Sequence, residues 1–417
     1  MNAERQRRIL VAIPTISHPE RVKLEGILAY AHERKNPRWQ VELDSPALFG
    51  APIALRPSAY DGIIAYVGGV RQRRALVQAR VPVVLIEDLH PPKTFACARH
   101  ALTLHCDHRA EGRTAAEHFL SRHFRAFAWV GTDTPTEWSR LRLAGYADRL
   151  AEAGFAPAVF SGARKGLSAW LGALPRPCAA FTACDFCARE VVYAAAAAGR
   201  AVPETLSVLG VDNDEAICTT VSPALSSLPT NDWRLGYCAG RLLNELLQNP
   251  SAGGRVIPFF SRAVVPRQST DADAVADPVV AATLHFARNN LASALDARHL
   301  ARRAGFSKRM LQLRVERALG HPLGEEIRRL RLSAAANLLA NASLPVEQVA
   351  ASCGYSSASH LALRFRESFK MTPLAYRTAA RSATASNSAH ISAVGLFVRS
   401  ETTTVTTKES TKPGASS

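Results

Sequence analysis

The sequence predicts an α/β protein of two lobes built on parallel sheets, followed by an all-α domain with two helix-turn-helix units. Three observations support this fold class. Over the first 270 residues, short apolar β-type runs alternate with longer helical patterns, which is typical of parallel sheets covered by helices. From Pro278 onward the pattern is entirely helical, and one segment of it repeats after about 50 residues.

The alternating region contains ten β-type runs, the first at Ile9–Ile13 and the last at Ser226–Leu228. Helical patterns separate them, as at Arg109–His123 and Phe186–Gly199. About 260 residues of this pattern suit two lobes, and ligands of open α/β sheets bind where the strands end. We therefore expect a sensor at 1–270, a linker at 271–278, a helical domain at 279–381 and a disordered tail at 382–417, where Ser and Thr dominate.

Composition and charge narrow the function classes. The chain of 417 residues is 47% hydrophobic and 21% charged, as in globular proteins, and no apolar run approaches the length of a membrane span. The start lacks the long apolar core of a signal peptide, so we expect a cytoplasmic protein with thiol cysteines and no membrane partner. The net charge is +16, and residues 279–381 hold 16 Lys/Arg against 6 Asp/Glu. Such concentrated basic charge indicates phosphate binding.

The repeated segment is a helix-turn-helix pattern. Its first copy has Gly305 at the turn, Phe306 behind it and Ser307 before an amphipathic helix. Its second copy has Gly354 and Tyr355 at the matching places. Glycine permits the left-handed turn, the aromatic fills the space between the helices, and Ser307 and Ser357 can cap the second helix. Buried stripes are expected on both second helices: Leu311, Val315 and Leu319; Leu361, Phe365 and Phe369.

These stripes determine which side chains face outward from the two recognition helices. Lys, Arg, Gln, Ser and His side chains can bond to base edges or phosphates of double-stranded DNA. The long helix expected at 323–340 would hold the two units about one DNA turn, ~34 Å, apart. A plain helical domain with a solvated basic face is the alternative, but two tandem copies favour DNA binding. The candidate DNA contacts are Lys308, Arg309, Gln312, Arg314, Ser357, Ser359, His360 and Arg364.

Residues 279–380 resemble the DNA-binding domain of the AraC family of regulators. The resemblance is carried by Val349, Cys353, Gly354 and Tyr355 in the second copy, followed by the stretch Thr372–Arg377. The sequence departs from the family at Leu361, where Phe is usual, and at Lys370, where Gly is usual. In the first copy, Leu313 and Val315 stand where a basic residue and Phe are common.

The first 270 residues resemble the sensor core of LacI/GalR-type repressors, which is related to periplasmic sugar-binding proteins. The matching stretches are Asp61–Ile64, Arg140–Tyr146, Leu206–Asn213 and Arg267–Thr270. Those repressors begin with a helix-turn-helix, whereas here the first strand is already expected at Ile9. The resemblance implies dimerisation through the sensor and a small sugar as effector, D-xylose among the candidates. The residues themselves leave another sugar or a purine open.

The resemblance also implies ligand contacts. Arg142 and Asp212 match the family's hydroxyl-binding Arg and Asp, and Asp185 follows a strand where the family has Asn or Asp. Trp138 could cover a sugar ring, and charged and amide groups suit vicinal hydroxyls. Interface or capping roles are the alternative for Arg142 and Asp212. The candidate ligand contacts are Thr15, Ser17, Trp138, Arg142, Asp185, Asp212 and Asn231.

Other chemistry is not supported. Cys184 and Cys187 form a CxxC without the second pair that a zinc site needs, so a structural thiol pair is the interpretation. The histidines around Cys106 would alternate between faces, and the pair Glu87 and Asp88 lacks a nucleophile or base. We predict no cofactor, metal or enzymatic activity. The function predicted is a sugar-controlled, sequence-specific transcription regulator, an activator that would contact RNA polymerase; a ligand-independent DNA-binding protein is the alternative.

Overall fold

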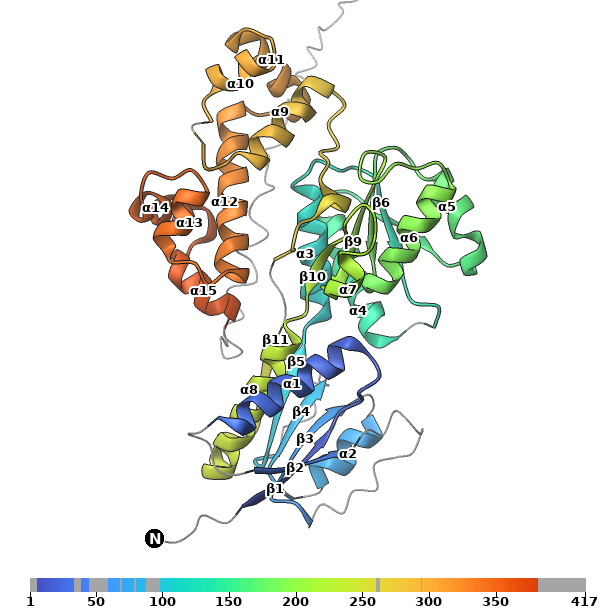
Figure 1. The fold of residues 1–417 in the computed structure, drawn as a ribbon, viewed down its shortest axis with the longest axis vertical. Helices are drawn as coiled ribbons and strands as arrows, with labels where there is room; N and C mark the ends of the chain where they lie inside the picture. The colour runs from blue at the N-terminus through green and yellow to red at the C-terminus, as the bar shows by residue number, and fades with distance from the viewer. Residues whose placement is uncertain are drawn as a thin grey trace, which may run out of the picture.

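The computed structural model describes residues 6–33, 39–44, 59–67, 70–78, 80–87, 98–134, 136–259, 263–293 and 295–381. Two α/β lobes and a helical domain are distinct in Figure 1. The tail predicted to be disordered, 382–417, lies outside the described residues, as does Asp88. Within the described residues, none of the helices combines the length and apolar character that a membrane crossing requires.

The first lobe is a parallel sheet with the strand order β11-β5-β4-β3-β1-β2. Its strands are buried and rich in Val, Ile and Leu because helices cover both faces of such a sheet. Helices α1 (His18–His32) and α8 (Asp232–Gln248) pack against each other, and α2 (Val70–Gln78) belongs to the same lobe. The strands are β1 (Arg7–Ala12), β2 (Trp39–Asp44), β3 (Gly62–Val67), β4 (Val83–Glu87), β5 (Ala101–Cys106) and β11 (Arg255–Phe259).

The second lobe is a parallel sheet with the order β10-β9-β8-β6-β7. Its core is aromatic, with Phe181 packed between Trp129 and Tyr146. The strands are β6 (Phe127–Val130), β7 (Pro157–Phe160), β8 (Cys178–Thr182), β9 (Leu206–Asp212) and β10 (Ser226–Pro229). The helices are α3 (His108–Leu120), α4 (Glu137–Glu152), α5 (Leu167–Ala173), α6 (Asp185–Ala197) and α7 (Glu215–Cys218).

The two-lobed prediction is confirmed, but the first lobe is discontinuous in sequence. The chain leaves it after β5, builds the second lobe, and returns through α8 and β11. Strand β11 pairs with β5 in parallel, and the alternating pattern did not predict it. It contains Pro258, which a strand tolerates at the edge of a sheet, where β11 lies. Helices α2 and α5 were also not predicted.

The helical domain contains two helix-turn-helix units on one long helix (Figure 1). The first unit is α10 (Ala297–Arg303) with α11 (Lys308–Leu319), and the second is α13 (Val346–Ser352) with α14 (Ala358–Phe369). Helix α12 (Leu323–Asn341) joins them; its 19 residues span about 28 Å at 1.5 Å each. Helices α9 (Pro278–Asn289) and α15 (Pro373–Arg381) complete the domain.

The segment predicted as a linker, 271–278, is fastened to its surroundings. The Asp273 carboxylate is buried and accepts a 2.5 Å bond from Arg288 of α9. Asp277 caps α9 by accepting from the backbone of Val279 and Val280. The backbone of Ala274 also donates to the carbonyl of Arg122 in the second lobe. The helical domain is therefore joined to the second lobe by several bonds at this segment.

Candidate functional site

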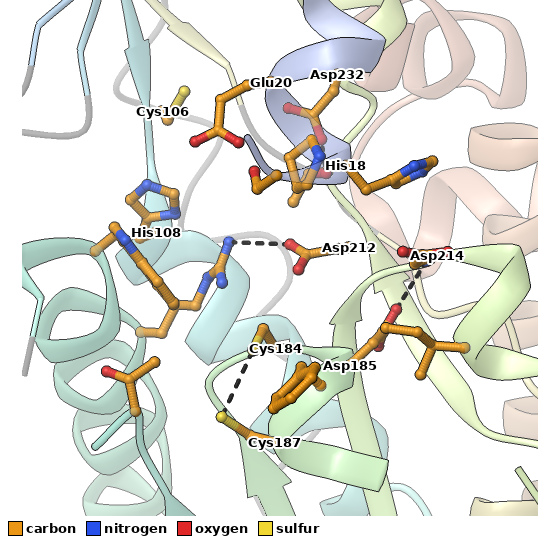
Figure 2. A pocket seen from close by; sticks show the side chains of 18 of the residues that line it. His18, Glu20, Cys106, His108, Cys184, Asp185, Cys187, Asp212, Asp214 and Asp232 are labelled. Atoms are coloured by element: carbon orange, nitrogen blue, oxygen red, sulfur yellow. Dashed lines mark hydrogen bonds and ion pairs between the residues drawn. The ribbon is translucent and has the colours of Figure 1, made fainter. Parts of the chain in front are cut away.

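A cleft of about 550 Å³ lies between the two lobes. The beginning of α1 and the ends of β3, β5 and β11 contribute its wall on the first lobe. The wall on the second lobe comes from α4, the beginning of α6 and the segment after β9. The cleft thus lies where parallel strands end, as the fold class predicts for a ligand site. Figure 2 shows side chains of both lobes around this space.

Arg142 is the central cation of the cleft, and it is only 4% exposed. Its Nε donates to Glu111 Oε2 at 2.8 Å and its Nη1 donates to the carbonyl of Ala183 at 2.6 Å. Its Nη2 lies 3.9 Å from Asp212 Oδ1, the ion pair drawn in Figure 2. The guanidinium also stacks on the Trp138 ring, 4.9 Å from its centre. These four contacts fix the position of Arg142 against the cleft.

The charges around Arg142 are compensated by their neighbours. Burial would raise the pKa of Glu111, but Arg142 and His108 outweigh it and lower that pKa to about 2. His108 Nδ1 bonds to the same carboxylate at 2.8 Å. Burial opposes the charged form of Arg142, yet Glu111 and Asp212 raise the pKa of the guanidinium above its usual value. Glu111 therefore stays ionised and holds Arg142 ionised.

Asp212 ends β9 in an unusual backbone conformation, with φ of 107°. A non-glycine residue adopts a positive φ only where the surroundings impose it, and such residues gather at functional sites. Burial raises the pKa of Asp212 well above its usual value, and Arg142 only partly opposes this. Among the candidate ligand contacts, Asp212, Arg142 and Trp138 are brought together in the cleft.

Asp185 lines the cleft, but the protein itself already bonds both its oxygens. Oδ1 accepts from Ser227 Oγ at 2.6 Å, and Oδ2 accepts from the backbone of Asp214 at 2.8 Å and from the Cys218 thiol at 3.3 Å. Burial raises its pKa to about 6. Asp185 thus holds together β8, β9 and β10 at their carboxyl ends, and its contact with a ligand stays a prediction.

The remaining candidate ligand contacts divide into two groups. Ser17 lines the cleft just before α1. Thr15 and Asn231 are absent from the lining, although Thr230 and Asp232 on either side of Asn231 belong to it. Asn231 is exposed and has φ of 55°, because it starts α8 without a side-chain capping bond. Sequence position placed the right segments at the cleft but not the right side chains.

Sequence reasoning missed the polar groups of the first lobe. Lys23 and Asp232 form a buried ion pair of 2.6 Å between α1 and α8. Glu20 lies one turn before Lys23 along α1 and lines the cleft, and in Figure 2 it lies near Asp232, across from Cys184. Its Oε2 is buried without a hydrogen-bond partner among the described residues, a condition that a ligand hydroxyl would relieve. The signal available was two charged residues three apart at the first helix.

Metal binding finds no support in the geometry. In the part of the chain that the structure describes, His, Cys, Asp and Glu side chains form no group of three that could hold a metal ion. Cys106 and His108 line the cleft at the end of β5, and His108 is bonded to Glu111. Cys184 and Cys187 lie side by side at the start of α6, also in the cleft wall.

The two helix-turn-helix units have the predicted interior. Gly305 and Gly354 both have φ of 74° at their turns. Ser307 Oγ accepts from the backbone of Met310, and Ser357 Oγ accepts from that of His360. The buried stripes lie against α12 and its neighbours in separate cores. The sequence pattern therefore predicted both units correctly.

The candidate DNA contacts differ in how free they are. Lys308 and Arg309 are exposed at the start of α11, and Ser359 and His360 are exposed at the start of α14. Arg314 is instead turned toward Asp277, to which it donates at 2.8 Å. Arg364 pairs with Glu367 on its own helix. Gln312 is partly exposed, and Ser357 has its hydroxyl in the capping bond described above.

Two exposed leucines occupy the same place in the two recognition helices. Leu313 is 50% exposed and Leu363 is 57% exposed, and each lies six residues after its capping serine. This position is in the middle of the face opposite the buried stripe. Apolar side chains on such a face suit the methyl groups of thymines in the major groove.

Comparison with known proteins agrees with this architecture. Residues 116–270 match the periplasmic binding protein-like domain, and residues 300–379 match a helix-turn-helix domain. The multiple antibiotic resistance protein MarA of Salmonella typhimurium is 30% identical over 111 residues, which are 27% of this chain and 84% of MarA. The chain belongs to the AraC-type helix-turn-helix transcription regulators and carries a periplasmic-binding-protein-like sensor domain.

Within that class, the chain is similar over most of its length to a particular regulator. The xylose operon regulatory protein of Escherichia coli (strain K12) is 25% identical over 372 residues, covering 86% of this chain and 93% of the relative. A solved structure titled as the xylose-binding transcription activator xylR has the same fold, with a TM-score of 0.56 and 24% identity. The match covers 90% of this chain and 98% of the other.

Proposed function

We propose that this protein is a sequence-specific transcription regulator whose affinity for DNA changes when a small sugar binds in the cleft between the lobes. D-xylose is the first candidate, because the names of the two full-length relatives refer to xylose. The activator role, which requires contact with RNA polymerase, has the same support. Homodimerisation through the sensor, which would present two DNA-binding domains to a repeated site, belongs to the proposal as well.

The observation that carries the proposal is the arrangement of Arg142, Asp212 and Trp138 opposite Glu20 and the buried Lys23–Asp232 pair. Fixed donors and acceptors on both walls can bond to several hydroxyls at once, and an indole can cover the apolar face of a sugar ring. The cleft volume of about 550 Å³ lies within the usual range for small-ligand sites. The site has the chemistry of polyol binding, without a nucleophile placed beside a base.

The position of the helical domain suggests how the ligand acts on DNA binding. This domain contacts the second lobe through the 271–277 segment and through Glu326 of α12, which lies 3.3 Å from His123. A ligand that bridges the lobes favours their closed arrangement, and it shifts the equilibrium only by its difference in affinity for the two arrangements. Closure would move the second lobe, together with the attached DNA-binding domain, relative to the first lobe.

The proposal is tested on the full chain by calorimetric titration with D-xylose, other pentoses, hexoses and purines. DNA affinity is then measured with and without the ligand that binds. Asp212→Ala should weaken ligand binding by roughly ten- to hundredfold, the value of a hydrogen bond to a charged group. Asp148→Ala, an exposed aspartate paired with Arg109 on the same lobe, is the matched control and should bind normally.

Two results would contradict the proposal. One is a protein that binds none of these compounds but still binds its DNA site, which would favour ligand-independent regulation. The other is an equal affinity for all DNA sequences with and without ligand, which would favour an architectural DNA-binding protein. Sedimentation velocity of the full chain checks the dimer, and a purely monomeric protein would remove that part of the proposal.

A further inference from the structure

The pair Cys184 and Cys187 has the geometry of a reactive dithiol. Cys184 caps the beginning of α6, and Cys187 is the third residue of that helix. The Cys184 thiol donates to Cys187 Sγ across 3.5 Å, the contact drawn in Figure 2. Both residues line the cleft; Cys184 is partly exposed, whereas Cys187 is 2% exposed. Two sulfur atoms this close need only a small shift to reach the bonding distance of about 2.0 Å.

The surroundings favour a thiolate at this pair. Arg164 Nη2 donates to Cys187 Sγ at 3.6 Å, and the Cys187 thiol itself faces the carbonyl of Gly131 at 3.5 Å. The N-terminus of α6 adds the positive end of its helix dipole. The hydrogen bond from Cys184, together with Arg164, holds the pKa of Cys187 below its usual value and that of Cys184 above its own. One thiol is thus prepared to lose its proton while the other keeps it.

Other described cysteines lack this environment. Burial raises the pKa of Cys178 and that of Cys353 to about 11. Cys238 is buried in the core of the first lobe. Buried apolar surroundings make a thiol inert, whereas nearby cations and a helix N-terminus make it reactive. Oxidation should therefore select the pair in the cleft.

We infer that Cys184 and Cys187 form a reversible disulfide whose formation weakens effector binding, so that the response of the regulator depends on the thiol redox state. The inference rests on the proposed function, in which this cleft is the effector site. Ala183, whose carbonyl holds Arg142, directly precedes the pair, and Asp185 lies between its members. Drawing the two sulfurs together would shift this segment and displace Arg142 from its bonded position.

The chemistry is a thiol–disulfide exchange with a small disulfide such as glutathione disulfide. One cysteine thiolate attacks a sulfur of the oxidant, which forms a mixed disulfide and releases one thiolate. The second cysteine then attacks the protein sulfur of the mixed disulfide and releases the other thiolate. The two protons of the cysteines end on the two released thiols, and the two electrons lost by the pair reduce the S–S bond of the oxidant.

The test uses the full chain equilibrated in glutathione buffers of graded redox potential. Mass spectrometry should find the loss of two hydrogens in the peptide that holds both cysteines, with a midpoint within the glutathione range. Effector affinity is then titrated in the reduced and oxidised forms. Displacement of Arg142 should weaken it by roughly ten- to hundredfold on oxidation, as for one hydrogen bond to a charged group.

Three variants separate this effect from general oxidation. Cys184→Ala and Cys187→Ala should each show the same affinity before and after glutathione disulfide, whatever that affinity is. Cys238→Ala, the matched control in the other lobe, should respond as the natural protein does. Effector binding protects the pair if the inference holds, so saturating ligand should slow disulfide formation.

Absence of the disulfide across the glutathione range overturns the inference, and so does a disulfide that leaves effector affinity unchanged. Failure of the proposed function has a different signature. In that case the reduced protein binds none of the sugars or purines, while the mass measurement still reports the disulfide. That result contradicts the effector part of the inference together with the proposed function.

Discussion

The two helix-turn-helix units share their interior but differ on their outer faces. Both have a glycine at the turn with the same φ and a serine cap on the recognition helix. Outside, α11 carries four basic residues and one acidic residue, whereas α14 carries two basic residues and one acidic residue. Packing restricts the buried positions because each must fill a fixed space. Exposed positions are free to diverge, so the units can fold alike and still contact different bases.

The interiors also differ in a way that the shared pattern conceals. Where α11 buries Val315, the equivalent position in α14 is Phe365, which stacks on Phe369 at 4.3 Å and contacts Tyr376 at 5.2 Å. The second unit therefore has an aromatic core that includes α15. The first unit has an aliphatic core and depends more on α9 and α12.

The largest effect should come from the two cores. Phe365→Ala is expected to destabilise the protein by about 3–5 kcal/mol, because it leaves a cavity among aromatic rings. Val315→Ala removes less volume and should cost roughly 2 kcal/mol. Denaturant unfolding monitored by circular dichroism measures both variants. Equal losses would show that the two cores contribute alike, against the comparison above.

The next effect concerns DNA recognition at matched positions. Arg309 and Ser359 each lie two residues after the capping serine, and both are exposed. Arg309→Ala should weaken binding to the cognate site by roughly 1–3 kcal/mol, and less on random DNA, because Arg can bond to a guanine through two hydrogen bonds.

Ser359→Ala is the paired measurement and should cost less, because a hydroxyl makes a weaker contact. Fluorescence anisotropy with cognate and scrambled duplexes at several salt concentrations distinguishes the cases. A uniform loss on both duplexes for Arg309→Ala, with a reduced salt dependence, would assign that side chain to a phosphate instead of a base.

A smaller effect is expected where the two recognition helices end. Gly320 and Lys370 both adopt the left-handed conformation, with φ of 78° and 57°. This conformation strains a residue with a Cβ, so Lys370→Gly should stabilise the protein by about 1 kcal/mol. Gly320→Ala should destabilise it by a similar amount. Thermal unfolding tests the pair, and a loss of stability in Lys370→Gly would mean that the 2.9 Å bond from Lys370 Nζ to Glu367 O outweighs the strain.

The smallest effect is the pH dependence of one bond of the first unit. Arg314 donates to Asp277, whereas its counterpart Arg364 bonds within α14. This hydrogen bond lowers the pKa of Asp277 below its usual 3.8. A lowered pKa in the folded state means that the stabilisation is complete above 3.8 and is lost as the pH falls through the lowered value. Arg314→Ala should flatten the acid limb of a stability–pH profile, whereas Arg364→Ala should leave it unchanged.

Local patterns predicted most elements because their causes are local. Buried strands such as β3 are continuous apolar runs, and the two glycine turns with their serine caps require only neighbouring residues. Strand β11 could not be predicted in this way, because it contains a proline and obtains its pairing from β5, far away in the chain. Likewise, the acidic segment 271–277 has the composition of a free linker, but Arg288 and Arg314 fix it in place.

The site divides along the same line. The sequence, through its resemblance to known sensors, identified Arg142, Asp212 and Trp138, and through its periodicity identified the outward faces of α11 and α14. Only the tertiary structure brought Glu20, Lys23 and Asp232 to the cleft, turned Arg314 toward Asp277 and placed the two cysteines beside Arg164. The physical reason is that a helix or turn is determined by residues a few positions apart. A charged pair or a cleft, in contrast, forms between segments that meet only when the chain has folded.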